Sequence, residues 1–370
     1  MNASAKSVRE RIDFGKIIAT AWSRYSFIFV FVIILFIYAM TIAFFGNTFR
    51  FNHITAILAS QNTVIVGIIA LGMAMVIITG QIDLSVGSAM ILCSGICIMV
   101  FNLTNSIVLT LLSAIAAGAI CGLANGILVG YAKMPPFIVT LGTMLIFRSL
   151  SLAYVREIPQ EITGSGSSQF ALDMSLGNYD LLRMVFGTGN LNIGIRIPYI
   201  TFLFVILLIV MMIVAKNTKY GKSVYSVGSN EKTAHLVGIN VQRVKMSVFV
   251  LVGIMVGFAA FVQACKIGNV TPASSGRSYE MYAIASVVLG GIAMSGGRGN
   301  LLGVFFGALS YTTINFIIVS IPALSTDIQD TFQGLVLIAV VLIQTVGPVI
   351  KENIMTLRRR KKAHDKLEQS

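Results

Sequence analysis

Apolar runs of about twenty residues recur along almost the whole of this 370-residue chain, and they restrict its fold more than any other feature. A helix of that length crosses the hydrocarbon core of a bilayer, where every backbone polar group needs a partner within the protein. Charged residues make up only 11% of the chain, against roughly 25% in an ordinary soluble domain. The sequence therefore predicts an all-α polytopic membrane protein.

The apolar runs predict about ten transmembrane helices, some of them broken. They are expected at 25–46, 57–79, 84–101, 107–131, 136–155, 199–215, 244–265, 280–295, 300–320 and 328–347. This divides the chain into a cytoplasmic N-terminal segment (1–24), a transmembrane domain (25–347) and a basic cytoplasmic tail (348–370). Within the transmembrane domain, 156–198 is predicted to be a polar outer loop and 216–243 a cytoplasmic segment. No apolar core precedes Phe27, so the first run is expected to be an uncleaved anchor.

The formal net charge of +13 is distributed as topology requires. Most of the 27 lysines and arginines fall in the N-terminal segment, in 216–245 and in the tail. Basic clusters beside apolar runs mark cytoplasmic segments and contact anionic lipid headgroups. The pattern predicts that both termini are cytoplasmic and that the charge serves the membrane, with no nucleic-acid partner.

The stretch GQIDLSVGS, 80–88, places an acidic residue, Asp83, between two apolar runs. An ionisable side chain at membrane depth costs several kcal/mol unless it faces protein or water. Asp83 can accept hydrogen bonds from the N–H groups of Ser85 or Val86 and so cap a helix, and the flanking glycines permit a sharp entry. Two interpretations remain open: a capped broken helix with a purely structural role, or an element that lines a path through the membrane.

Glu280 is an acidic residue at the beginning of the predicted eighth span, EMYAIASVVLGG, just as Asp83 lies at the beginning of the third. With five spans in each half, the two lie in opposite orientations, and the pattern predicts an inverted repeat with discontinuous helices. Arg148, near the outer end of the fifth span, is expected to extend its guanidinium towards the membrane surface; a role in the site is the alternative. The residues predicted to line a path or gate are Gly80, Asp83, Ser85, Gly87, Asn125, Thr140, Glu280 and Arg298.

The segment KYGKSVYSVGSNEKTAHLVGINVQRVKMS, 219–247, contains a predicted short helix from about Asn230 to Val237. Asn230 is a suitable N-cap and Gly238 a suitable stop. A short helix on the cytoplasmic face favours contact with a partner; the alternative is a solvated loop.

Five segments, in order and spread over about 54–347, resemble the membrane permease subunit of bacterial ATP-binding-cassette (ABC) importers for monosaccharides, of the ribose, xylose and galactose type. They are GQIDLSVGS, ANGILVGYAKMPPFIVTLGTM, VGSNEKTAHLVGIN, YEMYAIASVVLGG and SGGRGNLLGVFFGAL. The resemblance implies that 228–240 forms the coupling helix that docks into a cleft of the ATPase subunit. The matching positions are Gly228, Asn230, Glu231, Ala234, Leu236, Gly238 and Ile239. The usual Arg is replaced by His235, which puts in doubt any salt bridge made there.

The resemblance also implies partners that this chain lacks. It carries no GxxxxGK[ST] phosphate-binding motif, so we expect no enzymatic activity and no cofactor in this chain, with ATP and Mg²⁺ held by a separate cytoplasmic ABC ATPase subunit. An extracytoplasmic sugar-binding protein and a second permease copy, identical or a close paralogue, are implied, in the bacterial cytoplasmic (inner) membrane. Outer arginines that run against the positive-inside trend are predicted to dock the binding protein, although a long loop also carries charge freely. They are Arg50, Arg156, Arg183, Arg196 and Arg277.

Two further interpretations stay open at this point. Within the importer class, the solute is a monosaccharide or another small solute: autoinducer-2, a nucleoside or a branched-chain amino acid. In a different class stands a secondary transporter coupled to an ion gradient through Asp83 and Glu280, which leaves the 219–247 segment without a role.

Overall fold

The computed structural model describes residues 14–322, except 61, 166–167 and 193–195, together with isolated positions between 331 and 346. The predicted tenth span and the basic tail lie outside the described residues, apart from those isolated positions. The helices and strands are α1 (Phe14–Phe44), α2 (Phe51–Ala59), η1 (Asn62–Val66, a π-helix), α3 (Gly67–Ile78), α4 (Val86–Thr104), α5 (Ile107–Gly130), α6 (Pro136–Glu157), α7 (Gln160–Thr163), β1 (Phe170–Ala171), α8 (Tyr179–Arg183), η2 (Met184–Thr188, a π-helix), β2 (Asn190–Asn192), β3 (Arg196–Pro198), α9 (Tyr199–Asn217), α10 (Lys219–Ser229), α11 (Glu231–Leu236), α12 (Val241–Ile267), β4 (Asn269–Val270), α13 (Tyr279–Leu289) and α14 (Leu301–Val319).

Seven described helices are long and apolar enough to cross a membrane, which confirms a polytopic helical fold. They are α1 (from Tyr25), α4, α5, α6, α9, α12 and α14. An eighth crossing results if α2 and the η1–α3 helix, which are bent by 52° relative to each other, form one span. The predicted eighth span, 280–295, is represented by α13, which has only 11 residues. This helix stops at Leu289 because Gly290 and Gly291 follow, the latter with φ +79°.

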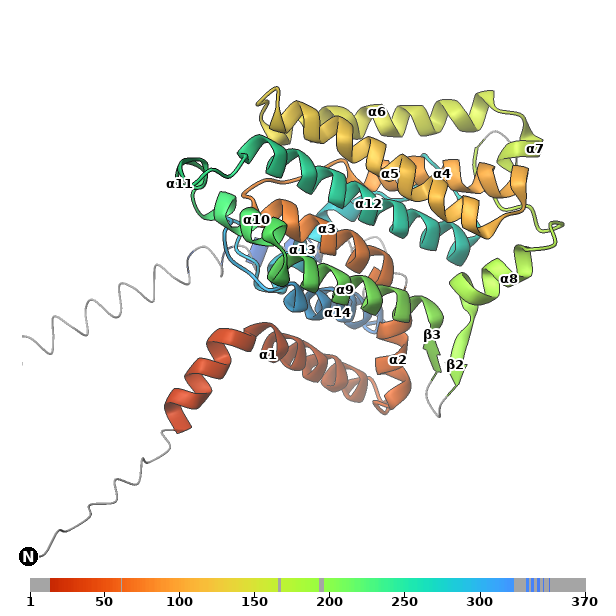
Figure 1. Cartoon of the computed structure of the whole chain (residues 1–370). Helices are drawn as coiled ribbons and strands as arrows, with labels where there is room; N and C mark the ends of the chain where they lie inside the picture. Colours follow the sequence, from red (N-terminus) through yellow and green to blue (C-terminus); the bar gives the residue numbers. More distant parts are fainter. Residues whose placement is uncertain are drawn as a thin grey trace, which may run out of the picture.

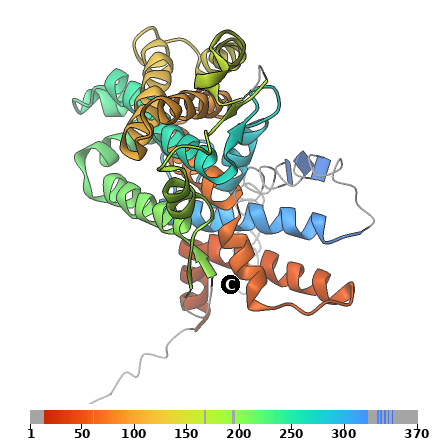
Figure 2. The ribbon, with the colours of Figure 1, turned by 90° about the vertical axis from the view of Figure 1, so that its right-hand side faces the viewer.

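The core is built around α3 and α12. Every residue of α3 from Gly67 to Ile78 is buried, and α12 packs against α3, α4 and α5. The two views place α5 and α6 on one side of this centre and α1 on the opposite side (Figures 1 and 2). The outer helices turn large apolar side chains away from the protein, as Phe36, Ile120 and Leu145 show, each more than 60% exposed. Such a surface suits lipid or another membrane-embedded subunit, since water would penalise it.

In the described part of the chain, α5 and α12 share the most extensive contact of any helix pair, and glycine makes their close approach possible. Gly118, Gly122, Gly126 and Gly130 recur every four residues along one face of α5. A methyl group at Gly122 would collide with the carbonyl oxygen of Phe249 on α12. In a membrane the hydrophobic effect does not drive helices together, so small residues that allow close backbone contact supply the packing energy. The two helices therefore form one closely packed pair.

The two ends of the bundle differ. Figure 1 shows α10, α11 and the turn between α5 and α6 at one end, and α7, α8, β2 and β3 at the other. At this second end β1 pairs antiparallel with β4, with Phe170 opposite Val270, and β2 pairs antiparallel with β3. The β1–β4 pair ties the polar 156–198 segment to the end of α12. The sequence thus separates a helical face from an irregular face on opposite sides of the membrane domain.

Candidate functional site

A buried polar cluster surrounds the start of α4. The Asp83 Oδ1 atom accepts hydrogen bonds from the Ser85 backbone N–H, at 2.8 Å, and from the Ser85 hydroxyl, at 2.6 Å. The Asn125 side-chain amide on α5 donates to Ser85 Oγ at 2.8 Å. All three side chains are no more than 2% exposed. The predicted bond from Ser85 to Asp83 is present. The N-cap residue of α4 is Ser85, however, and Asp83 lies two residues before it, because the helix begins at Val86.

The start of α13 lies against the start of α4. A Cβ atom at Gly87 would lie 2.7 Å from Glu280 Oε2, so the absence of a side chain at Gly87 admits the carboxylate. Arg148 on α6, expected to extend towards the membrane surface, is half-buried against the backbone ahead of α13. Its guanidinium donates to the carbonyl oxygens of Pro272 and Ser275, at 2.7 Å each, because the segment ahead of α13 folds inward and offers unpaired carbonyls. Asp83, Glu280 and Arg148 are close enough to interact electrostatically.

Two amide side chains, Gln81 and Asn125, also belong to this region, and Asn125 is among the residues predicted to line a path. Gln81 is 6% exposed, and neither its Oε1 nor its Nε2 has a hydrogen-bond partner; the same holds for Asn125 Oδ1. Buried amides normally find partners, so these unpaired atoms are the hydrogen-bonding groups that the cluster leaves available. Thr140 on α6 is buried as well, but its hydroxyl donates to the Pro136 carbonyl of its own helix. In the described part of the chain, no three His, Cys, Asp or Glu side chains gather as metal ligands would.

We expect Asp83→Asn to reduce transport and yet retain part of it, within roughly tenfold of the wild type. The Asn oxygen still accepts from the Ser85 N–H, whereas Asp83→Leu leaves a buried donor unpaired at a cost of about 1–3 kcal/mol. Solute uptake by cells with equal amounts of each variant in the membrane measures the difference. Complete loss of uptake in the Asn variant, with normal assembly, would show that the charge itself is needed and would favour ion coupling.

The loop that carries Arg298 meets the end of α3 at the α10 end of the bundle. The Gly297 N–H donates to the Ile78 carbonyl at 2.8 Å, and two residues later Gly80 turns the chain with φ +78°. Gly228 on α10 packs so closely here that any side chain would collide with the same carbonyl. Arg298 itself is exposed. Of the residues predicted to line a path, Gly80 and Arg298 thus lie in a different group from the Asp83 cluster.

The predicted short helix exists as α11, and its limits follow from its caps. The Asn230 Oδ1 atom accepts from the Thr233 N–H at 3.0 Å, and Gly238 ends the helix with φ +85°. Ala234 is buried, whereas Leu236 is 84% and Val237 70% exposed. Apolar side chains so exposed on a capped helix favour a protein partner over a solvated loop.

The structure corrects the placement of Gly228, which the resemblance assigned to the same helix as α11. Gly228 belongs to the separate helix α10, because the chain turns at Asn230 with extended backbone angles. Sequence reasoning missed α10, although Thr218 is a suitable N-cap and Gly221, Val224 and Val227 recur at helical spacing on its buried face. The Tyr225 hydroxyl donates to the Gly299 carbonyl at 2.9 Å, and burial raises the pKa of this tyrosine.

The outer arginines fall into two groups. Arg50, Arg156 and Arg277 are exposed. Arg183 is partly buried and donates to the carbonyl oxygens of Cys265 and Lys266, so it fastens the outer segment to the end of α12. Arg196 begins β3, and its side chain lies outside the described residues.

The comparisons with known proteins agree with this architecture. Residues 54–341 match the family described as branched-chain amino acid transport system / permease component. The chain belongs to this permease family. The permease is 35% identical to the ribose import permease protein of Bacillus subtilis (strain 168) over 277 residues, which cover 75% of this chain and 80% of that protein.

Other relatives transport related solutes by name. The fructose import permease protein of Rhizobium meliloti is 34% identical over 297 residues, covering 79% of the permease and 78% of the relative. The galactose/methyl galactoside import permease protein of Escherichia coli (strain K12) is 32% identical over 265 residues, covering 67% and 74%. No solved structure matches the chain significantly. The family and the seven apolar spans together make the permease a multi-pass protein of the inner membrane.

Proposed function

We propose that this permease is the transmembrane subunit of an ATP-driven importer and forms the path for a monosaccharide delivered by an extracytoplasmic binding protein. The family match supports a permease role, and relatives named for ribose, fructose and galactose support the solute class. ATP hydrolysis then takes place on a separate cytoplasmic subunit that binds α11.

The observation that carries the proposal is the short connection between α11 and the broken segment at Asp83. α11 follows α10 directly, and Gly228 of α10 touches the Ile78 carbonyl at the end of α3. Five residues later the chain reaches Asp83. A displacement of α11 by a partner therefore acts on the segment that leads into the polar cluster. The unpaired amide of Gln81 and the unpaired Oδ1 atom of Asn125 supply hydrogen-bonding groups of the kind that sugar hydroxyls need.

The finer topology is part of this proposal. It comprises ten spans in two inverted halves, with both termini and α11 in the cytoplasm, and two permease copies around a central path. The starts of α4 and α13 lie close together, with Gly87 against Glu280. This supports the repeat, because in such a repeat the half-helices of the two halves meet near the middle of the membrane.

Isolation of the tagged permease from its own bacterium tests the proposal. We expect an ATPase subunit with a phosphate-binding motif and a soluble binding protein to be recovered with it. Titration of that binding protein should show affinity for ribose, fructose or galactose over adenosine and leucine. Preference for a nucleoside or an amino acid would contradict the solute class, and recovery of no ATPase would contradict the importer.

The exposed outer arginines yield a prediction about the binding protein. Reversal of Arg50, Arg156 and Arg277 to Glu should slow its association, and the wild-type rate should fall as salt rises, because exposed charges are screened over about 10 Å at 0.1 M. Stopped-flow mixing with the permease in nanodiscs measures the rate. Arg183→Glu is the control: it should lower thermal stability, since it removes the bonds to α12, and leave the salt dependence unchanged. Association that ignores both salt and the triple reversal would assign the docking face elsewhere.

A further inference from the structure

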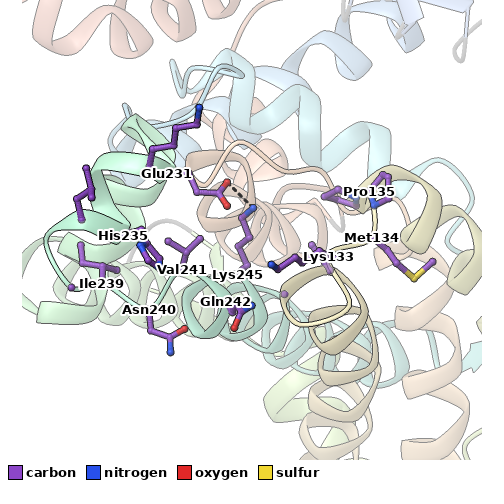
Figure 3. Close-up of a pocket in the computed structure, with 16 residues that line it drawn as sticks. Lys133, Met134, Pro135, Glu231, His235, Ile239, Asn240, Val241, Gln242 and Lys245 are labelled. Atoms are coloured by element: carbon purple, nitrogen blue, oxygen red, sulfur yellow. Dashed lines mark hydrogen bonds and ion pairs between the residues drawn. The ribbon is translucent and has the colours of Figure 1, made fainter.

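A groove of about 1210 Å³ opens beside α11. One wall consists of α11 and the first turns of α12; the other is the turn between α5 and α6, from Val129 to Pro136. Figure 3 shows Glu231 and Lys245 on the first wall, with Lys133 and Pro135 across from them. None of the residues of the second wall was singled out for a partner by the sequence. The groove therefore extends the surface of α11 across to another pair of helices.

Positive charge dominates the groove. Glu231 is the one acidic residue among those described along its walls, and it already pairs with Lys245 at 2.8 Å. Lys133 and Lys232 add exposed cationic side chains, and His235 lies beside them. A surface with this excess of positive charge favours a partner element that carries carboxylates.

The second wall is a fixed turn. The Met134 N–H donates to the Leu128 carbonyl at 3.1 Å, and two prolines, Pro135 and Pro136, restrict the backbone that follows. Lys133 has φ 55°, in the left-handed region that a residue with a side chain seldom adopts. The turn thus presents the Lys133 side chain from one backbone conformation, and a preformed contact loses little entropy when a partner binds.

We propose that the turn at Lys133–Pro135 is a second contact for the ATPase subunit, which inserts an acidic element into the groove between this turn and α11. The inference rests on the proposed function. Continuity supports this occupant: His235 and Leu236 of α11, and Gly238 just after it, line the same groove, so a subunit seated on α11 reaches the turn. The ATPase then contacts both helices of the closely packed α5–α12 pair, and α5 carries Asn125 of the polar cluster.

A charge reversal tests the contact. The permease variant is reconstituted in nanodiscs, and the ATPase subunit that was isolated with the wild-type permease is added. Lys133→Glu should weaken ATPase binding at least about tenfold. Lys222→Glu on α10 is the matched control, because Lys222 is equally a lysine exposed at this end but does not line the groove. It should change the affinity by less than about threefold.

Cysteine labelling gives an independent measurement that needs no change in charge. The four native cysteines are all buried, so Met134→Cys introduces a thiol that a bulky maleimide reaches selectively. Bound ATPase should slow labelling of Met134→Cys at least about tenfold and leave labelling of Lys222→Cys unchanged.

The outcomes separate the inference from the proposed function. If changes in α11 abolish ATPase binding while Lys133→Glu behaves like Lys222→Glu and Met134→Cys stays reactive, the second contact is wrong and the proposed function stands. If neither α11 nor the turn affects binding, both fail. Protection of Met134→Cys without ATPase, in permease dimers only, would assign the groove to a second copy and overturn the inference.

Discussion

Leu236→Asp combined with Val237→Asp is expected to abolish recovery of the ATPase with the permease, while the permease itself still enters the membrane. Leu236 is the last residue of α11 and Val237 follows it; both side chains are at least 70% exposed and contribute little to folding. If they fill an apolar pocket of the ATPase, two buried carboxylates without partners cost several kcal/mol, which lowers the affinity by a factor of a thousand or more. Affinity purification from membranes, with the ATPase quantified by immunoblot, measures the loss.

Met174→Asp is the matched control for this experiment. Met174 is 78% exposed and lies in the polar segment at the opposite end of the bundle. The same change in chemistry there should leave ATPase recovery within twofold of the wild type. Normal recovery of the ATPase with the α11 double variant would contradict the assignment of α11 as the coupling helix.

Gly122→Leu is expected to destabilise the permease by about 3 kcal/mol or more, at the upper end of overpacking, or to prevent its assembly. A side chain at this position meets the Phe249 backbone of α12, and backbone cannot move aside as a flexible side chain can. The α5–α12 pair must then separate, and Asn125, one turn further along α5, loses its bond to Ser85. Thermal unfolding in detergent, followed by size-exclusion chromatography, measures the effect.

Gly142→Leu on α6 is the control, because a side chain there has open space around it. It introduces the same leucine into a membrane helix without a collision, so the unfolding temperature should stay within about 2 °C of the wild type. Equal loss in the two variants would show that leucine in a helix, and not the α5–α12 contact, is responsible.

The sequence predicted the features that depend on local chemistry. Apolar runs, the basic clusters and the caps of α11 at Asn230 and Gly238 are each determined by a few neighbouring residues, so they could be read without coordinates. The bond from Ser85 to Asp83 is of the same kind, since the two residues are neighbours in the chain.

The features that the sequence did not reveal depend on residues far apart in the chain. Arg148 pairs with carbonyls more than 120 positions away, and nothing near Arg148 indicates that the 272–275 segment folds inward. The hydrogen bond from Asn125 to Ser85 forms only because α5 packs against α12 and α4 in the folded protein. The groove likewise forms between the α5–α6 turn and the α11–α12 segment, which are about 100 residues apart in the chain. The sequence around Lys133 does not indicate it.

Uptake by proteoliposomes tests the central claim most directly. The vesicles contain the permease and its ATPase, the binding protein and a radiolabelled monosaccharide are outside, and ATP is trapped within. We predict accumulation of the sugar that requires ATP and the binding protein, continues when ionophores collapse all ion gradients, and is lost with the α11 double variant. Accumulation driven by an ion gradient without ATP would contradict the importer and assign the transport to an ion-coupled mechanism.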